Sequence, residues 1–356
     1  MNTQILTTPS GETYPIKTGS GLLQSIGTEL AAITKPCRVM IVSDSNVAPL
    51  YLLKVTKSLA EAGFFTQTHV VPAGEESKSI AVLGELLEAF AEAHLTRTDL
   101  AVALGGGVIG DLTGFAAGCY LRGIRFVQIP TTLLAAVDAS VGGKTAVNLA
   151  HGKNLAGLFH QPIGVYCDVD TLQTLPEHEI ADGAAEAIKH GILDDPALFD
   201  IYENGNPAEK YEEIIVRSVI YKSKIVMEDP NEKGVRKMLN LGHTPAHAIE
   251  RLSNFAISHG HAVAIGLAIV ARASVRRGIL DSDESARIIN TIRRSGLPVL
   301  CPYSAADMAT VATLDKKAAA SDITVILPEK IGQCRMEKMP LTELESLFTD
   351  GQEGQA

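Results

Sequence analysis

Several features that would identify a class of protein are missing from this sequence. Its 356 residues include no tryptophan, and the aromatic residues together make up only 5%. Five cysteines lie far apart, at positions 37, 119, 167, 301 and 334, so no pair has the spacing of a metal-binding or redox motif. This dispersed set predicts reduced structural thiols and a cytoplasmic protein.

Positive charge and long apolar runs are also scarce. The chain has 31 Lys and Arg against 41 Asp and Glu, and its net charge of −10 argues against nucleic acid or an anionic membrane as a partner. The most membrane-like stretch, AVAIGLAIVA at 262–271, is far shorter than the ~20 residues of a spanning helix. The N-terminal residues lack the basic and apolar segments of a secretory signal.

The residues that are present predict two domains. Apolar runs rich in β-branched residues at 38–44, 68–74, 99–107 and 125–132 predict buried strands, and the segments between them have helical periodicity. This alternation favours a Rossmann-like α/β domain with a parallel sheet. Beyond it the pattern is helical, apart from two short strands expected around 331–332. We therefore predict an α/β domain over residues 1–178 and an all-α domain, with that one exception, over 179–356.

A glycine-rich turn follows the third predicted strand. Gly105, Gly107 and Gly110 match Gly-x-Gly-x-x-Gly, in which backbone N–H groups at a helix N-terminus approach a pyrophosphate. The same pattern also occurs where glycine is needed only for packing. Position 130, where the usual dinucleotide fingerprint has an acid, is proline. Asp44, at the end of the first predicted strand, is a candidate partner for a ribose instead.

A second glycine-rich segment, DASVGGKTAVN at 138–148, looks at first like a loop for nucleoside triphosphates. That pattern requires glycine six residues before the lysine. Here the position is Asp138, a carboxylate where an anion would have to bind. We therefore predict that Lys144 has a role other than binding ATP.

Histidines concentrate in the helical half. Four of the ten lie between positions 243 and 261: His243, His247, His259 and His261. Upstream, Glu186 lies in the segment GAAEAIKHG. Two imidazoles and a carboxylate are a common catalytic zinc set that leaves one coordination position open for substrate.

A proline within the first histidine pair affects how the two rings are placed. Pro245 is tolerated in a first helical turn, so Thr244 is a candidate N-cap and His243 then precedes the helix. On that interpretation His243 and His247 need not share a face. One of them can bind metal while the other contacts substrate.

Together these segments resemble one enzyme family. From about residue 40 to 335 the chain is similar to the 3-dehydroquinate synthases in the blocks GGGVIGDLTGFAAGCYLRGIRF, QIPTTLLA, VDASVGGKTAVN, GKNLAG, GAAEAIKHG, LNLGHT, HGHAVAIG and DKK. The resemblance implies an NAD-binding α/β domain, a helical metal-binding domain, an active site in the cleft between them, and a homodimer.

The resemblance also implies a reaction of the shikimate pathway, in aromatic amino acid biosynthesis. The substrate is the sugar phosphate 3-deoxy-D-arabino-heptulosonate 7-phosphate, and the products are 3-dehydroquinate and phosphate. NAD⁺ transiently oxidises a hydroxyl, phosphate is eliminated, the hydride is returned, and an intramolecular aldol step closes the carbocycle. The net reaction is that of a lyase.

The resemblance assigns roles residue by residue. The implied ligands of Zn²⁺ or Co²⁺ are Glu186, His243 and His259. The implied catalytic residues are Lys144, Glu186, Lys189 and the proton relay His247. The implied substrate contacts are Arg122 (across the dimer), Asp138, Lys144, Asn154, Lys189, Lys222, Arg236, Asn240, His247, Lys316 and Lys317. The implied NAD contacts are Asp44, Glu75, Lys78, Gly107, Val108, Ile109, Gly110, Asp111, Thr131, Thr132, Lys144, Lys153, Thr171, Leu172, Gln173 and Thr174.

The chain departs from the usual family pattern at four places. Pro245-Ala246 replaces Phe-Gly, His261 replaces Glu, and His190 replaces Tyr. The fourth departure is Ser321, which stands where the loop after the DKK block usually has glycine. The first three border the predicted metal site.

Three alternative functions have their own signatures. A related sugar phosphate cyclase would share NAD, metal and fold, but the presence of Lys222, Arg236, Asn240 and His247 favours dehydroquinate as the product. A metal-dependent polyol dehydrogenase would release one NADH per substrate. A non-catalytic binding protein is disfavoured by the complete ligand set and lysine cluster.

Overall fold

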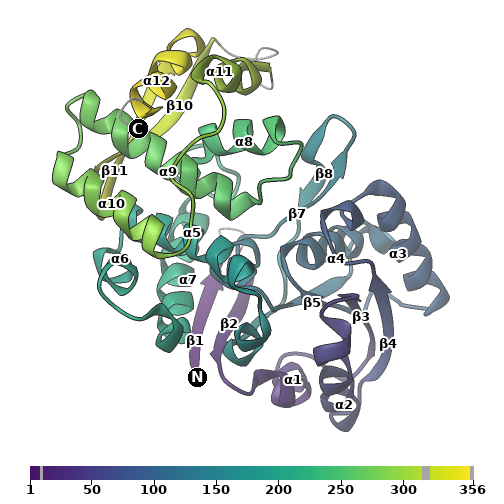
Figure 1. The fold of residues 1–356 in the computed structure, drawn as a ribbon. Helices are drawn as coiled ribbons and strands as arrows, with labels where there is room; N and C mark the ends of the chain where they lie inside the picture. The colour runs from purple at the N-terminus through teal and green to yellow at the C-terminus, as the bar shows by residue number, and fades with distance from the viewer. Residues whose placement is uncertain (9–10, 315–320, 353–356) are drawn as a thin grey trace. The chain divides into compact units, whose positions relative to one another are not determined.

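The computed structural model describes residues 1–8, 11–314 and 321–352 (Figure 1). The chain divides into two compact units, Met1–Leu175 and Pro176–Ala356. The boundary expected between residues 178 and 179 therefore lies inside α5 (Glu177–Leu193), the first helix of the second unit.

The first unit is built on a seven-stranded sheet with the strand order β1-β2-β9-β6-β5-β3-β4. Its strands are β1 (Asn2–Thr7), β2 (Thr13–Gly19), β3 (Arg38–Asp44), β4 (Phe65–Val71), β5 (Leu100–Gly105), β6 (Arg125–Pro130) and β9 (Val165–Asp168). The pair β1–β2 is antiparallel, and the other neighbouring pairs are parallel. The predicted α/β fold with a parallel sheet is confirmed.

Strand β4 differs from its predicted range. It spans residues 65–71, three residues earlier than the predicted 68–74. Pro72 follows directly, and proline has no backbone N–H to continue the ladder. Strand β4 lies at the edge of the sheet, and Phe65 at its start is 74% exposed, so its half-polar sequence gave a weak strand signal.

Helices cover both faces of this sheet. They are α1 (Leu22–Ala31), α2 (Leu53–Glu61), α3 (Ile80–Glu92) and α4 (Gly107–Cys119). Alternate residues of β3 enter different cores: Ile41 packs with residues of α1 and α2, whereas Val42 packs with residues of α3 and α4. A strand buried on both faces requires a nearly continuous apolar run, which explains why the sequence predicts β3 correctly.

A separate antiparallel hairpin follows in the first unit. It consists of β7 (Lys144–Leu149) and β8 (Gly152–Phe159). The DASVGGKT segment leads directly into β7. Lys144 therefore opens a strand, whereas the lysine of a triphosphate-binding loop opens a helix.

The second unit is mainly helical. Its helices are α5, α6 (Pro196–Glu203), α7 (Tyr211–Glu228), α8 (His243–Leu252), α9 (His259–Arg276), α10 (Ser282–Arg294), α11 (Ala305–Leu314) and α12 (Leu344–Gln352). The hairpin of β10 (Asp322–Lys330) and β11 (Gln333–Pro340) flanks residues 331–332, as predicted, so the unit is not strictly all-α.

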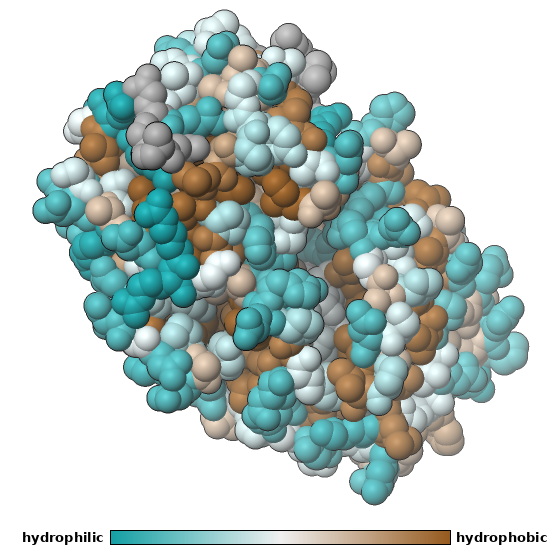
Figure 2. Space-filling model, viewed as in Figure 1, coloured by the Kyte–Doolittle hydropathy of each residue, from teal (hydrophilic) through white to brown (hydrophobic). Residues whose placement is uncertain are grey.

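The apolar segment at 262–271 forms the buried middle of α9, and it packs inside the second unit. Within the described part of the chain, no helix has the length and apolar character needed to cross a membrane. The face drawn in Figure 2 carries hydrophilic side chains among apolar ones over both units.

Candidate active site

Glycines bring three helices of the second unit into backbone contact. A Cβ added at Gly260 of α9 would lie 2.3 Å from the carbonyl oxygen of Asp182 in α5. A Cβ at Gly266 would lie 2.1 Å from the carbonyl oxygen of Gly242, just before α8. Only glycine permits such close approaches. The start of α8 and the first turns of α9 are therefore held against their neighbours.

Helix α8 begins two residues earlier than the predicted N-cap implies. Its first residue is His243 and its N-cap is Gly242, with φ 75°, so the expected N-cap at Thr244 is wrong. Glycine adopts this left-handed conformation easily and turns the chain directly into the helix. Pro245 then lies in the first turn, where backbone N–H groups have no partner within the helix. The His243 and His247 rings meet edge to face, with centroids 5.5 Å apart.

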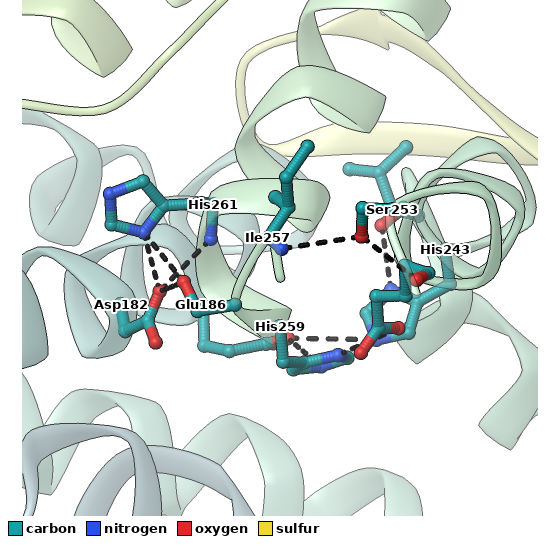
Figure 3. Close-up of polar contacts among 10 residues, drawn as sticks. Asp182, Glu186, His243, Ser253, Ile257, His259 and His261 are labelled. Carbon is teal, nitrogen blue, oxygen red and sulfur yellow. Dashed lines mark hydrogen bonds and ion pairs between the residues drawn. The ribbon is translucent and has the colours of Figure 1, made fainter. Parts of the chain in front are cut away.

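The predicted metal ligands lie together. Glu186, His243 and His259 each offer one ligand atom, and these atoms lie within 4.8 Å of one another. Glu186 Oε1 is 3.5 Å from His243 Nε2 and 3.3 Å from His259 Nε2 (Figure 3). The Glu186 side chain is fully buried, whereas 12% of His243 and 32% of His259 is exposed. The glutamate thus forms the base of the group and His259 its more open side.

The other ring nitrogen of each histidine has an acceptor. His243 Nδ1 is 3.1 Å from the carbonyl oxygen of Leu241, and His259 Nδ1 is 3.4 Å from Glu250 Oε2. Both partners only accept, so each places a proton on Nδ1 and directs Nε2 toward Glu186. Metal-bound histidines usually donate their second N–H to such a group. Two oriented imidazoles and one carboxylate fit a catalytic site for a divalent metal.

Burial and neighbouring charges give His243 and His259 very different pKa values. Burial, helped by the positive charge of Lys189, lowers the pKa of His243 to about 3. Burial alone would lower that of His259, but hydrogen bonds to Glu186 and Glu250 outweigh it and raise the pKa to about 10. A metal ion that binds here must displace the proton from His259, as expected for ligands that compete with protons.

Two further predicted residues lie next to this group. Lys189 is buried, and its Nζ contacts Glu186 Oε2 from one turn further along α5. The His247 ring is stacked near His259, with centroids 6.5 Å apart, but His247 is not one of the grouped ligands. His261 points elsewhere, with Nδ1 2.7 Å from Asp182 Oδ1. The three predicted ligands therefore form one set, and Lys189 and His247 lie beside it, where they can contact a substrate.

The remaining predicted substrate contacts of this unit come from α7 and the 3₁₀ segment Val235–Asn240. Lys222 and Arg236 are buried, and Arg236 Nη1 donates to the carbonyl oxygen of Pro230 at 2.6 Å. Asn240 Nδ2 donates to Glu232 Oε1 at 2.8 Å. Lys316 and Lys317 lie outside the described residues.

Most of the predicted NAD contacts of the first unit follow the carboxyl ends of parallel strands. Asp44 ends β3, Glu75 and Lys78 follow β4, residues 107–111 follow β5, Thr131 and Thr132 follow β6, and residues 171–174 follow β9. The carboxyl ends of parallel strands meet at one edge of a sheet, which is where ligands of such folds bind. Helix α4 begins directly after β5, so its N-terminal N–H groups are available at this edge.

Contacts within this edge order its loops. Lys78 Nζ contacts the Asp111 carboxylate, and the Thr131 N–H donates to the carbonyl oxygen of Gly105 at 3.0 Å. Asp44 Oδ1 accepts from the backbone N–H groups of residues 46 and 47, at 2.9 and 3.0 Å. Packing also requires one of the motif glycines, because a Cβ at Gly110 would lie 2.6 Å from the Gln128 side chain. The glycine motif therefore has a packing reason beside any role in binding.

The remaining predicted contacts of the first unit lie in turns and in the hairpin, with Asp138, Lys144 and Asn154 predicted to contact substrate and Lys144 and Lys153 to contact NAD. Asp138 lies in the π-helical turn Ala135–Ala139, while Lys144, Lys153 and Asn154 belong to β7 and β8. Arg122 has a φ of 66°, which is unusual for a residue other than glycine.

Residues that the sequence did not single out connect the predicted ones. Asn148 donates from Nδ2 to Glu75 Oε1 at 2.7 Å and accepts at Oδ1 from the Asn154 N–H at 2.9 Å. Glu250 supports His259, and Asp182 holds the start of α9. The available signal was spacing, since Asp182 lies one turn before Glu186 in the same predicted helix.

The two units correspond to two known family regions. Residues 68–182 match 3-dehydroquinate synthase N-terminal, and residues 183–318 match 3-dehydroquinate synthase C-terminal. The chain belongs to the 3-dehydroquinate synthase family. The 3-dehydroquinate synthase of Streptococcus sanguinis is 42% identical over 342 residues, which cover 94% of this chain and 96% of that protein. The 3-dehydroquinate synthase of Pelotomaculum thermopropionicum is 43% identical over 329 residues, which cover 90% of this chain and 89% of that protein. The resemblance predicted from the sequence is confirmed.

Solved structures share the fold. The 2-epi-5-epi-valiolone synthase of Streptomyces hygroscopicus, with NAD⁺ and Zn²⁺ bound, superposes with a TM-score of 0.87 at 27% identity, covering 96% of this chain and 97% of that chain. A 2-deoxy-scyllo-inosose synthase with carbaglucose-6-phosphate, NAD⁺ and Co²⁺ gives 0.87 at 23% identity, covering 98% and 100%. Sulfoacetaldehyde reductase from Bifidobacterium kashiwanohense superposes with a TM-score of only 0.67 at 15% identity, covering 99% of each chain.

Proposed function

We propose that this protein converts 3-deoxy-D-arabino-heptulosonate 7-phosphate into 3-dehydroquinate and phosphate, using NAD⁺ and a divalent metal. The observation that carries the proposal is the convergence of Glu186, His243 and His259 in a chain of this family. The level of identity favours dehydroquinate over other carbocycles. Relatives named 3-dehydroquinate synthase are 40–43% identical, whereas the valiolone and inosose synthases are 27% and 23% identical.

The metal centre has a defined role in this proposal. Glu186, His243 and His259 would hold Zn²⁺ or Co²⁺, which would supply Lewis-acid polarisation of a substrate hydroxyl. The Lys189 ammonium, beside Glu186, can donate a hydrogen bond to an oxygen of the substrate. His247 lies beside both ligand rings and is suited to move a proton to or from the substrate.

The edge of the sheet in the first unit is the proposed NAD site. Bound NAD⁺ would supply a hydride acceptor that oxidises one substrate hydroxyl and later returns the hydride. The N–H groups at the start of α4 suit the pyrophosphate, and Asp44 suits a ribose hydroxyl. In the substrate, the new ketone acidifies the neighbouring C–H, so phosphate can leave. Ring opening and an aldol closure then complete the carbocycle.

An acidic protein needs local positive charge to bind an anionic sugar phosphate. Lys144 and Arg122 in the first unit and Lys189, Lys222 and Arg236 in the second unit are the proposed cations. Each charge-assisted hydrogen bond contributes about 1.5–3 kcal/mol, so several are needed to replace the hydration of a phosphate. We further propose a cytoplasmic homodimer in which Arg122 serves the partner's site.

One assay tests the proposed function. Purified protein is supplied with the heptulosonate phosphate, NAD⁺ and Zn²⁺ or Co²⁺, and both phosphate and 3-dehydroquinate are measured over time. We expect the two products to form in equal amounts. Failure to release phosphate, or formation of a different carbocycle from another sugar phosphate, would contradict the proposal.

A further inference from the structure

One carboxylate oxygen of α5 holds the start of α9. Asp182 Oδ1 accepts from Ser258 Oγ at 2.6 Å. It also accepts from the backbone N–H of His261 at 3.0 Å and from His261 Nδ1 at 2.7 Å (Figure 3). Residue 258 is the N-cap of α9 and residue 261 lies in its first turn. His259, a proposed metal ligand, lies between them in the chain.

Helices α5 and α9 also meet one turn further along α5. Glu186 follows Asp182 by four residues in α5, so both side chains lie on one helical face. Glu186 Oε1 faces His259 Nε2, while Asp182 binds the residues on either side of His259. At Asp182 itself, Gly260 lets the two backbones approach closely, because a Cβ at Gly260 would lie 2.3 Å from the Asp182 carbonyl oxygen. The position of His259 relative to Glu186 is therefore set by adjacent contacts of the same pair of helices.

Helix α9 depends on this external carboxylate at its N-terminus. The side chain of its N-cap residue, Ser258, makes no capping hydrogen bond to a backbone N–H of the helix and instead contacts Asp182 Oδ1 and His261 Nδ1. The first N–H groups of a helix have no partner within the helix, and negative charge near them is favourable. Asp182 supplies both an acceptor and a charge from a neighbouring helix.

A glutamate at position 261 would not fit this arrangement. An ionised glutamate side chain only accepts hydrogen bonds, whereas the imidazole of His261 can donate one. The His261 ring therefore adds a third donor to Asp182. It also explains why His261 does not belong to the metal-ligand group despite its position two residues after His259.

We propose that Asp182 is a positioning residue of the metal centre, which fixes the first turn of α9 so that His259 Nε2 faces Glu186. The inference rests on the proposed function, because it takes Glu186, His243 and His259 as the metal ligands. His259 is the most exposed of the three and lies in a first turn, where helices fray most readily. Groups that orient metal ligands typically change metal affinity by about 10- to 100-fold when removed.

The test compares two aspartates that cap helices in the same unit. Asp281 caps α10 by accepting from the Asp283 N–H at 2.8 Å, and it has no part in the metal site. Asp182→Ala and Asp281→Ala are titrated with Zn²⁺ against a chelating dye, well below their unfolding temperatures. Co²⁺ binding is followed by visible absorption, which reports ligand geometry.

We expect Asp182→Ala to bind one equivalent of Zn²⁺ at saturation but about tenfold or more weakly than wild type, with an altered Co²⁺ spectrum. Asp281→Ala should lower the thermal midpoint but leave metal affinity unchanged. If Asp182→Ala does not fold, Asp182→Asn, which keeps an acceptor but loses the charge, should show a smaller loss that Asp281→Asn lacks.

Two results would overturn the inference alone: a wild-type affinity in the folded Asp182 variant, or equal losses in the Asp182 and Asp281 variants. Either can occur while the wild-type protein binds metal and releases phosphate. A wild-type protein that binds no stoichiometric metal and releases no phosphate would overturn the proposed function, and this inference with it.

Discussion

Lys189 follows Glu186 by one turn of α5, and its Nζ contacts Glu186 Oε2 inside the second unit. The opposite oxygen, Oε1, faces the two histidines of the proposed metal centre. Both side chains are buried, so this contact is little screened by water. The i, i+3 spacing thus holds the proposed catalytic lysine at a proposed metal ligand.

The first prediction concerns this lysine. Lys189→Ala should slow phosphate release by about 100-fold or more, because it removes a proposed contact to the reacting part of the substrate. The dissociation constant for NAD⁺ should stay nearly unchanged, since the proposed NAD contacts belong to the first unit. Exposed Lys224 provides the control, and Lys224→Ala should behave as wild type. A large loss of NAD⁺ affinity in Lys189→Ala would contradict the assigned role.

The second prediction distinguishes the two histidines at the start of α9. His259→Ala should lose stoichiometric metal and activity, because its Nε2 belongs to the ligand group. His261→Ala should keep one equivalent of metal, because its ring is bound to Asp182. Metal analysis of the two purified variants provides the answer. The opposite pattern would show that the ligand assignment is shifted by two residues.

The third prediction is a pH dependence of the metal-stripped protein. The pKa of His259 is raised from 6.5 to about 10 in the folded protein, so the folded state holds a proton that the unfolded state releases. The stabilisation is complete below pH 6.5 and is lost as the pH rises toward 10. Urea midpoints measured between pH 6.5 and 9 should therefore fall.

A matched pair of variants isolates the contribution of this histidine. His259→Ala should flatten the decline, while a variant of the exposed His178 should retain it. An equal decline in wild type and His259→Ala would assign the pH dependence to other groups.

The fourth prediction tests the close contact between α8 and α9. In Gly266→Ala the new Cβ would lie 2.1 Å from the Gly242 carbonyl oxygen, so the helices must separate. Overpacking of this kind costs about 1–3 kcal/mol, and metal affinity should also fall because α8 carries His243. Gly84→Ala in α3 is the control, as its Cβ would meet nothing within 4 Å. Denaturant unfolding that places Gly266→Ala at or above wild-type stability would show that the contact adjusts freely.

The buried parallel strands were the most predictable part of the fold. Most residues of β3 and β5 are apolar, because helices cover both faces of these strands. The hairpin of β7 and β8 was not predicted. β8 reads GKNLAGLF and is half exposed, so its strand conformation depends on pairing with β7 and not on its own pattern.

In the site, too, some features follow from the local sequence and others depend on tertiary packing. The resemblance predicts Glu186, His243 and His259 as ligands, but spacing alone does not decide between His259 and His261. In the structure, Asp182 binds the His261 ring, and it lies 79 residues earlier in the chain and reaches His261 only through helix packing. Pro245 predicts a helix that starts after Thr244, whereas the left-handed conformation of Gly242 starts α8 at His243.

A dehydrogenase-like fold that performs a net lyase reaction must regenerate its NAD⁺ in every turnover, so the fate of NAD distinguishes it from a dehydrogenase. The protein is given an excess of the heptulosonate phosphate with substoichiometric NAD⁺, and phosphate and NADH are followed together. We expect many phosphates to be released per NAD⁺ supplied, with no accumulation of NADH. Accumulation of one NADH for each substrate consumed, with turnover ending when NAD⁺ is exhausted, would contradict it and indicate a polyol dehydrogenase.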